Sequence, residues 1–271
     1  MVSKFLFYLR AAGLCALLAL AATLPAPAAP APKVTVVSFG LFGNQSVFES
    51  EAKGAARILA DRLHAVSTVV RYNTKKGGDA TAENLYATLQ SAAKKMDVDN
   101  DILTVVLTTH GAPAGLAVIS GNLRELLPPP YLAAMLDATK VRHRIVIISA
   151  CYSGVFIPFL ASPDTLVITA ADANHPSFGC RDRATWTYFG DAFFNTALRK
   201  TENLSEAFAL AQKLVREREL KNGFEPSNPQ MAGGENVVPL LQPSAPADRA
   251  GIEPKMGTRG VPAYSAGLPL P

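Results

Sequence analysis

The sequence of 271 residues predicts an α/β protein, a three-layer α/β/α sandwich with a mainly parallel sheet of about six strands. Three observations predict this fold class. Short runs of Val, Ile, Leu and Thr recur along the chain and contain almost no charged residues, which is typical of strands buried on both faces. Segments with apolar residues at helical spacing separate these runs. Strands that alternate with helices favour a parallel sheet that is covered on both sides.

Three strands are predicted in the first half of the chain, with a helix after each of the first two. The strands are short runs rich in β-branched residues, at 34–40 (VTVVSFG), 67–72 (STVVRY) and 102–109 (ILTVVLTT). Ser50 can cap the first helix. Apolar or small residues follow it at helical spacing, namely Ala52, Ala56, Leu59 and Leu63. The second helix follows the turn signal KKGGD (75–79) and has one apolar face, made of Leu85, Leu89, Ala92 and Met96.

The second half of the chain predicts three more strands and three more helices. The strands are expected at 144–149 (RIVIIS), 165–171 (TLVITAA) and 236–241 (NVVPLL). Pro239 places the last strand at an edge of the sheet, because proline cannot donate a ladder hydrogen bond. The helices are expected at 131–139, at 184–199 and at 203–220, where Asn203 can cap the helix.

The N-terminus predicts a signal peptide over residues 1–28, so we expect an exported protein that is periplasmic or secreted. Two basic residues among the first ten precede an apolar run (11–24), and an Ala/Pro-rich stretch (25–32) follows it. A membrane-spanning helix needs roughly 20 apolar residues, so an uncleaved signal anchor is the less favoured alternative. A lipoprotein is disfavoured, because Leu14 precedes Cys15 where a small residue is expected.

The remainder of the chain divides into one domain and a tail. Residues 29–242 suit a single domain with a sizeable core. From residue 243 the chain is rich in Pro, Gly and Ala and lacks an apolar period, so it cannot bury enough surface to offset the entropy of ordering. We therefore predict a flexible tail over residues 243–271.

Charge and composition exclude several partners. The formal net charge of +4 falls to +2 without the two basic residues of the signal peptide, and the remaining Lys and Arg residues form no run. We therefore expect no nucleic-acid partner, and no membrane partner beyond an uncleaved anchor. No recognised metal-ligand spacing occurs, so we predict no metal and no cofactor. Nothing in the sequence indicates the oligomeric state.

Two reactive side chains follow directly on predicted strands. His110 ends the run TVVLTTHG and Cys151 ends the run RIVIISACYSG. In open parallel sheets, ligands bind beyond the carboxyl ends of the strands. If the two strands are neighbours, they are about 5 Å apart, and the imidazole and the thiol overhang one crevice. An imidazole favours the nucleophilic thiolate. The backbone N–H groups of Gly111 and Cys151 could then face a developing oxyanion.

Less specific interpretations exist for each residue alone. A single buried cysteine usually acts as an inert small hydrophobic residue, and a single histidine is more often structural than catalytic. A histidine and a cysteine that both follow predicted strands indicate acyl transfer by a cysteine nucleophile more strongly than His110 or Cys151 does alone.

The sequence also resembles the legumain family of caspase-like cysteine peptidases, the asparaginyl endopeptidases. The resemblance runs in order over roughly residues 34–240 and rests on five stretches. These are VTVVSFGLFGNQSVFESEA (34–52), TTHG (108–111), SACYSG (149–154), ITAADANHPSFGC (168–180) and TYFGDAFF (187–194).

This resemblance implies a caspase-haemoglobinase-like fold and a cysteine endopeptidase. Cys151 would be the nucleophile, His110 the general acid and base, and Gly111 an oxyanion donor, with a thioester acyl-enzyme as intermediate. An Asn orients the histidine in legumains. Asn44 matches it by residue type, although a gapless alignment places Gln45 there.

The substrate pocket departs from the legumain pattern. Val47 or Phe48 stands in place of an Arg, and Tyr152 stands in place of the Glu that follows the nucleophile, whereas Asp191 and Ser177 match pocket residues. A pocket that keeps its carboxylate and loses its Arg should prefer a basic or small polar side chain, and its preference for Asn should be weakened. Alternatively, Asp191 only satisfies free N–H groups at the start of a helix.

Three other functions compete with the endopeptidase. A transpeptidase or ligase would share the acyl-enzyme and differ only in the second nucleophile. A catalytically silent peptide-binding protein would have no need of the Cys/His pair. A thiol redox protein is disfavoured, because no Cys-x-x-Cys motif is present. We expect Cys180 to be a free, partly buried thiol, because a bridge to Cys151 would inactivate the nucleophile.

Overall fold

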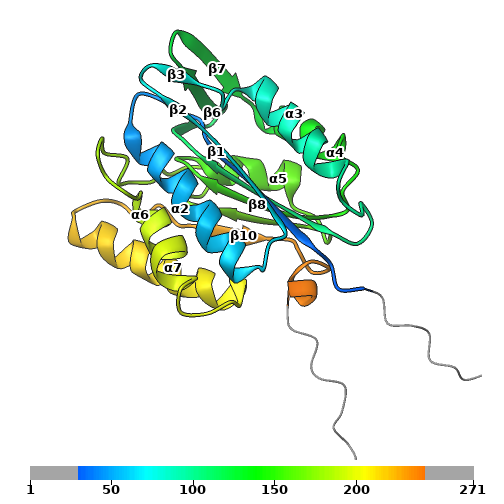
Figure 1. Ribbon diagram of the computed structural model, residues 1–271. Coiled ribbons are helices and arrows are strands. Elements are labelled where there is room, and N and C mark those ends of the chain that lie inside the picture. The colour runs from blue at the N-terminus through cyan, green and yellow to red at the C-terminus, as the bar shows by residue number, and fades with distance from the viewer. Residues whose placement is uncertain (1–29, 242–271) are drawn as a thin grey trace, which may run out of the picture. The chain divides into compact units, whose positions relative to one another are not determined.

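A seven-stranded sheet forms the centre of the computed structural model, which describes residues 30–241 (Figure 1). Its strand order is β10-β9-β8-β4-β1-β2-β3. The five central strands are mutually parallel, and β10 and β3 are antiparallel to their neighbours. Their bounds are β1 Val34–Gly40, β2 Ser67–Thr74, β3 Gly77–Gly78, β4 Ile102–Thr108, β8 His143–Ser149, β9 Thr165–Thr169 and β10 Gln230–Ala232. The mainly parallel sheet predicted from the sequence is confirmed.

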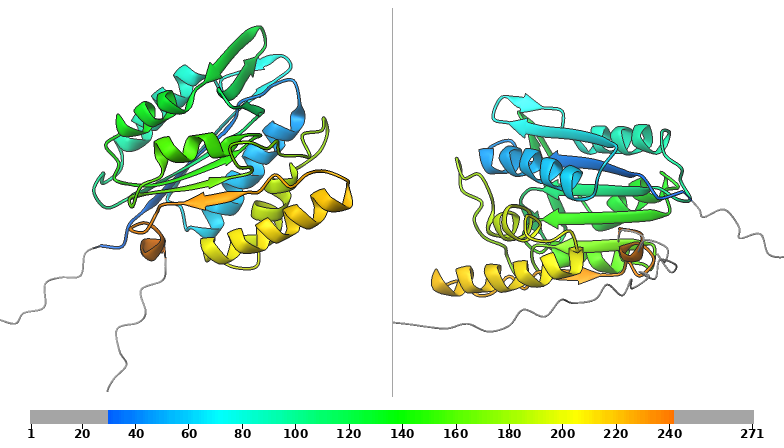
Figure 2. Two further views of the ribbon diagram at one scale, coloured as in Figure 1. Left: turned by 180° about the vertical axis from the view of Figure 1, so that it is seen from behind. Right: turned by 60° about the horizontal axis from the view of Figure 1, so that its bottom comes forward.

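Helices cover both faces of this sheet (Figures 1 and 2). One face carries α2 (Ser46–Arg62), α6 (Tyr188–Gly190), the π-helical segment η2 (Asp191–Ala197) and α7 (Leu204–Lys221). The other face carries α3 (Ala82–Ala93), α4 (Pro129–Asp137) and α5 (Ile157–Leu160). Two 3-10 turns, η1 (Ser153–Phe156) and η3 (Val238–Leu241), complete the fold. The three-layer α/β/α sandwich is therefore also confirmed.

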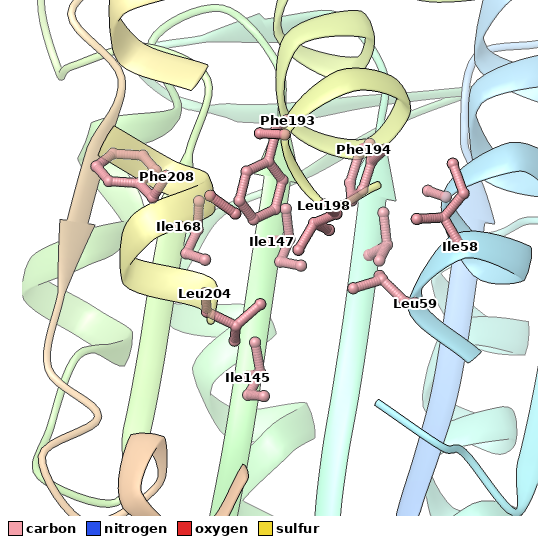
Figure 3. Packing of buried hydrophobic residues seen from close by; sticks show 14 of the residues in the cluster. Ile58, Leu59, Ile145, Ile147, Ile168, Phe193, Phe194, Leu198, Leu204 and Phe208 are labelled. Carbon is pink, nitrogen blue, oxygen red and sulfur yellow. The ribbon is translucent and has the colours of Figure 1, made fainter. Parts of the chain in front are cut away.

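The core lies in two layers because successive strand residues point to opposite faces. On β8, Ile145 and Ile147 belong to the layer beneath α2, η2 and α7, whereas Val146 and Ile148 belong to the layer beneath α3, α4 and α5. Figure 3 shows the first layer, in which side chains of η2 and α7 lie over β8 and β9. Since fully burying one such side chain contributes roughly 1.5–3 kcal/mol, these two layers supply the main stabilisation of the sheet.

A second, three-stranded sheet was not predicted from the sequence. It consists of β5 (Gly111–Ala112), β6 (Gly115–Ser120) and β7 (Leu123–Leu127) in antiparallel order. Its strands are short, and four of the five residues of β7 are exposed. The sequence therefore contains no buried apolar run that would predict these strands. The small sheet matters for the site because β6 contacts the loop that follows β1, through hydrogen bonds of Ile119 with Leu41 and Gly43.

One predicted element near the C-terminal end of the fold was wrong, and another has different bounds. Residues 236–241 are not an edge strand, because the N–H groups of Val238 and Leu240 bond locally to carbonyls three or four residues earlier. The edge is formed by β10 instead, paired with β9. The helix expected over 184–199 begins later and is partly π-helical, with a bond from Leu198 N–H to the Phe193 carbonyl.

The predictions for the chain ends lie outside the described residues. These are the signal peptide over 1–28, the tail over 243–271 and the exported location, so they stay predictions. Within residues 30–241, no helix is both long enough and apolar enough to cross a membrane.

A buried asparagine fixes the loop between β1 and α2. Asn73 on β2 is 1% exposed. Its Nδ2 donates to the carbonyls of Leu41 at 3.0 Å and Ala80 at 2.8 Å, and its Oδ1 accepts from the Ala80 N–H at 3.0 Å. These three hydrogen bonds pair the carbonyls of Leu41 and Ala80 and the N–H of Ala80. The start of the β1–α2 loop, at Leu41, is thereby held to β2.

We expect Asn73→Ala to lower the free energy of unfolding by about 2–4 kcal/mol, because each buried polar group left without a partner costs roughly 1–3 kcal/mol. Urea unfolding followed by circular dichroism measures the loss. Asn44→Ala is the matched control, since Asn44 lies in the same loop and is exposed. Equal losses in the two variants would show that the buried amide does not hold the loop.

Candidate active site

The two reactive side chains predicted from the sequence lie on neighbouring strand ends. Strands β4 and β8 pair in parallel, and the last pair in their register is Thr108 with Ser149. A further bond, from the Thr109 N–H to the Ser149 carbonyl at 3.2 Å, continues the pairing beyond the strands. His110 and Cys151 each follow this last pair by two residues, so the register brings them to the same level of the sheet.

Gly111 shows how closely the two strand ends approach. A Cβ atom at this position would lie 2.1 Å from the carbonyl oxygen of Cys151 and 3.2 Å from the Cβ of Ala150. Only glycine fits there, because any side chain would collide with the backbone of the nucleophile. The structure therefore brings the backbone at Gly111, directly after His110, against that of Cys151.

The imidazole of His110 is held by an amide and two aromatic rings. Its Nε2 forms a short hydrogen bond with Oε1 of Gln45. The rings of Phe42 and Phe48 meet it edge-on, with centroids 4.5 Å and 5.0 Å away. The Gln45 amide is itself oriented, since its Nε2 donates to the Cys180 carbonyl at 3.0 Å. An amide oxygen can only accept a hydrogen bond, so the neutral ring carries its hydrogen on Nε2 and leaves Nδ1 as the basic atom.

Burial also sets the charge state of this ring. The surrounding phenyl rings withdraw the imidazole from water, and this desolvation lowers the pKa of His110 below its ordinary value of 6.5. The ring is therefore neutral at neutral pH and can accept a proton, as a general base requires.

The sulfur of Cys151 contacts Ser177, in the loop that follows β9. The Ser177 N–H donates to Sγ at 3.3 Å, the Ser177 hydroxyl lies 3.8 Å from Sγ, and the thiol can donate to the Ser177 carbonyl at 3.3 Å. Ser177 thus holds the sulfur to the loop after β9 through its N–H, its hydroxyl and its carbonyl. Cys151 is partly exposed, as a nucleophile must be.

Tyr152 shapes the turn after the nucleophile. Its φ of 55° lies in the left-handed region, which is uncommon for a residue with a large side chain. Its N–H donates to the His175 carbonyl at 2.9 Å. The turn is thus fixed to the loop that also carries Ser177.

Gln45, and not Asn44, is the residue that supports the histidine. Asn44 is exposed at the tip of the loop, whereas Gln45 stands directly before α2 and reaches the imidazole. In the sequence, residue type alone favoured Asn44. The gapless alignment with the legumain family indicated Gln45, which is the residue that contacts the imidazole.

Asp191 does not present a free carboxylate. Its Oδ2 pairs with Nη1 of Arg218 on α7 at 2.9 Å, and its Oδ1 accepts from Asn195 at 2.9 Å. The Arg218 guanidinium also lies over the Tyr188 ring, 4.0 Å from its centroid. The hypothesis that an uncompensated acid at Asp191 would attract a basic substrate side chain therefore loses its basis.

Cys180 is a free thiol, as expected, and Cys151 is free as well. Burial, together with the nearby Cys151 and Glu51, raises the pKa of Cys180 to about 12. Since the thiolate is the reactive form, Cys180 does not compete with Cys151 as a nucleophile at physiological pH.

Other features do not form a second candidate site. Among the described side chains, no group of three or more His, Cys, Asp and Glu residues could hold a metal ion. Asp172 instead pairs with Nδ1 of His175 at 2.7 Å. A surface groove of about 790 Å³ lies between α7 and β10, and none of the residues that line it is a Cys, Ser or His.

Comparisons with known proteins bear on the family and the fold of the chain. Residues 62–238, more than half of the chain, match the peptidase C13 family. No curated protein matches the chain significantly. Among solved structures, the chain is similar to caspase-1 from Spodoptera frugiperda, with a TM-score of 0.53 and 16% sequence identity. That similarity covers 78% of this chain and 93% of the caspase. At this identity the likeness concerns the fold alone, and it confirms the caspase-like architecture predicted from the sequence.

We expect Gln45→Ala to release the imidazole from its single tautomer. Nitrogen-15 NMR of the His110 ring should show hydrogen on Nε2 in the wild type and a mixture of both tautomers in the variant, because the amide oxygen that fixes the proton is removed. Asn44→Ala is the control and should leave the spectrum unchanged. A wild-type ring protonated on Nδ1 would contradict the assignment of the free nitrogen.

Proposed function

Because the chain belongs to the peptidase C13 family of cysteine peptidases, we propose that it is an endopeptidase in which Cys151 and His110 form the catalytic dyad. The single observation that carries this proposal is the contact between the two strand ends, where Gly111 touches the Cys151 carbonyl. A nucleophile and a base brought together from distant parts of the chain are what acyl transfer requires. The substrates would be peptides or proteins.

The proposed reaction begins with the thiol of Cys151. Its proton passes to Nδ1 of His110, and the sulfur attacks the carbonyl carbon of the peptide bond. The resulting oxyanion would accept hydrogen bonds from the backbone N–H groups of Gly111 and Cys151. The N–H of Cys151 supports this role, because it donates to no acceptor within residues 30–241.

The tetrahedral intermediate then collapses to a thioester. The carbon–nitrogen bond breaks, and the imidazolium gives its proton to the leaving amine. In the second half of the reaction a water molecule loses a proton to His110 and attacks the thioester. The acid product leaves, and the proton returns to the sulfur.

We further propose that the residue before the cleaved bond is small, polar and uncharged. The side chain that contacts the sulfur of Cys151 is that of Ser177, which carries no formal charge. The carboxylate of Asp191 is neutralised by Arg218. A charged substrate side chain would lose its hydration here without gaining an opposite charge.

Labelling with a thiol-reactive peptide probe tests the dyad. We expect one adduct, located by mass spectrometry at Cys151, and none in Cys151→Ala. In His110→Ala the labelling rate and kcat should fall by at least about 100-fold, within the range that general acid–base catalysis contributes. Cys180→Ala is the matched control and should label at the wild-type rate. Full-rate labelling of Cys151 in His110→Ala would remove the histidine from the mechanism.

Substrates that differ only at the residue before the cleaved bond test the specificity. We expect kcat/KM for Asn and Ser to exceed the values for Lys and Asp by at least about 10-fold, the ratio that corresponds to 1.4 kcal/mol. Asp191→Asn should change these ratios by less than about threefold, because Arg218 already neutralises the carboxylate. A wild-type preference for Lys that Asp191→Asn abolishes would refute the proposal and restore the acidic pocket.

A further inference from the structure

Glu51 is a fully buried carboxyl group that the proposed reaction does not use. It lies on α2 and is 0% exposed. Its Oε1 accepts from the hydroxyl of Thr108 at 2.9 Å, and its Oε2 accepts from the backbone N–H of Thr187 at 2.8 Å. The side chain thus joins α2 to the end of β4 and to the start of α6.

No positive charge accompanies this carboxyl group. Within the described part of the chain, Glu51 takes part in no ion pair, and its polar contacts are hydroxyl and backbone groups. The ionisable group near it is the thiol of Cys180. Burial raises the pKa of Glu51 above its ordinary value of 4.5, because an unpaired charge in the interior costs several kcal/mol.

The surroundings are shaped to admit this side chain. A Cβ atom at Gly190 would lie 2.0 Å from Oε2 of Glu51. Gly190 belongs to α6, and its N–H donates to the hydroxyl of Thr187, the residue that caps this helix. The first turn of α6 therefore leaves an opening that the Glu51 carboxyl group fills.

The hydrogen-bond partners of Glu51 lie close in the chain or in space to both members of the proposed dyad. Thr108 stands two residues before His110 on β4, and Ser149, which stands two residues before Cys151 on β8, lies 3.3 Å from the Thr187 hydroxyl. The helix that carries Glu51 also begins next to Gln45, which bonds to the imidazole. The Glu51 carboxyl group therefore contacts directly the strand end that leads to His110, at Thr108. It contacts the strand end that leads to Cys151, at Ser149, through Thr187.

We propose that Glu51 is a positioning residue whose hydrogen bonds to Thr108 and Thr187 set the placement of His110 relative to Cys151. The proposal rests on the proposed Cys–His function. An apolar residue would fill the same space and satisfy neither partner, and burying a polar group costs free energy unless it is hydrogen-bonded. The carboxyl group of Glu51 therefore does more than fill space, because its two hydrogen bonds connect Thr108 with Thr187.

Two substitutions separate the reach of the side chain from its acidity. Glu51→Gln keeps the length and an uncharged head that can accept one hydrogen bond and donate another. Glu51→Asp keeps the acid and is one methylene shorter, so it cannot reach both Thr108 and Thr187. We expect kcat to stay within threefold of the wild type in Glu51→Gln and to fall at least 10-fold in Glu51→Asp, with KM changed less than threefold in both.

The alkylation of Cys151 by iodoacetamide provides a second readout that needs no substrate. In Glu51→Asp the pH midpoint of the alkylation rate should move upward by at least half a pH unit, because a displaced imidazole stabilises the thiolate less. In Glu51→Gln the midpoint should stay at the wild-type value. Asp101→Ala is the matched control: Asp101 is also a buried carboxyl group next to β4, but at the opposite end, where it accepts from the N–H groups of Lys33 and Asp97. It should lose stability without any change in the midpoint.

Each outcome decides the proposal. A wild-type kcat and midpoint in a folded Glu51→Asp would overturn it, and so would an equal loss in Glu51→Gln, which would assign the effect to charge. If Glu51→Asp does not fold, Glu51→Gln decides alone: wild-type kcat and midpoint support the proposal, and a loss of either overturns it. The Cys151→Ala control keeps the two hypotheses apart, since activity that persists in that variant refutes the dyad itself, whatever the Glu51 variants show.

Discussion

The parallel pairing of β4 with β8 is the constraint on which the site depends. Each strand is seven residues long, and the register is maintained from Ile102 with His143 to Thr108 with Ser149. A shift by one residue would turn every buried side chain to the opposite face of the sheet, and both core layers oppose such a shift. The same packing that stabilises the sheet therefore fixes how His110 and Cys151 stand relative to each other.

The two halves of the site are supported from different sides of the fold. The imidazole is oriented from the β1–α2 loop by Gln45, and the sulfur from the loop after β9 by Ser177. These supports are themselves joined, because the Gln45 amide donates to the Cys180 carbonyl three residues beyond Ser177. The imidazole of His110 and the thiol of Cys151 thus share one hydrogen-bonded frame, and the proposed reaction would benefit from such preorganisation of polar groups.

The sequence predicts those features that depend on local pattern. The strands could be located because runs such as RIVIIS are buried on both faces, and the resemblance to a family of cysteine peptidases is confirmed by the family match. Features that depend on distant partners could not be predicted. The Asp191–Arg218 pair joins residues that are 27 positions apart, and the strands of the small second sheet are too short and too exposed for a periodic signal.

The contact between Glu51 and Gly190 has a consequence for how this protein can evolve. The carboxyl group occupies the volume that any side chain at position 190 would need, so neither site can vary freely while the other is retained. A lineage could acquire alanine at position 190 only after a smaller residue had replaced the glutamate. The order of substitutions is thereby prescribed by geometry, and homologous chains should retain or lose the acid and the glycine as a unit.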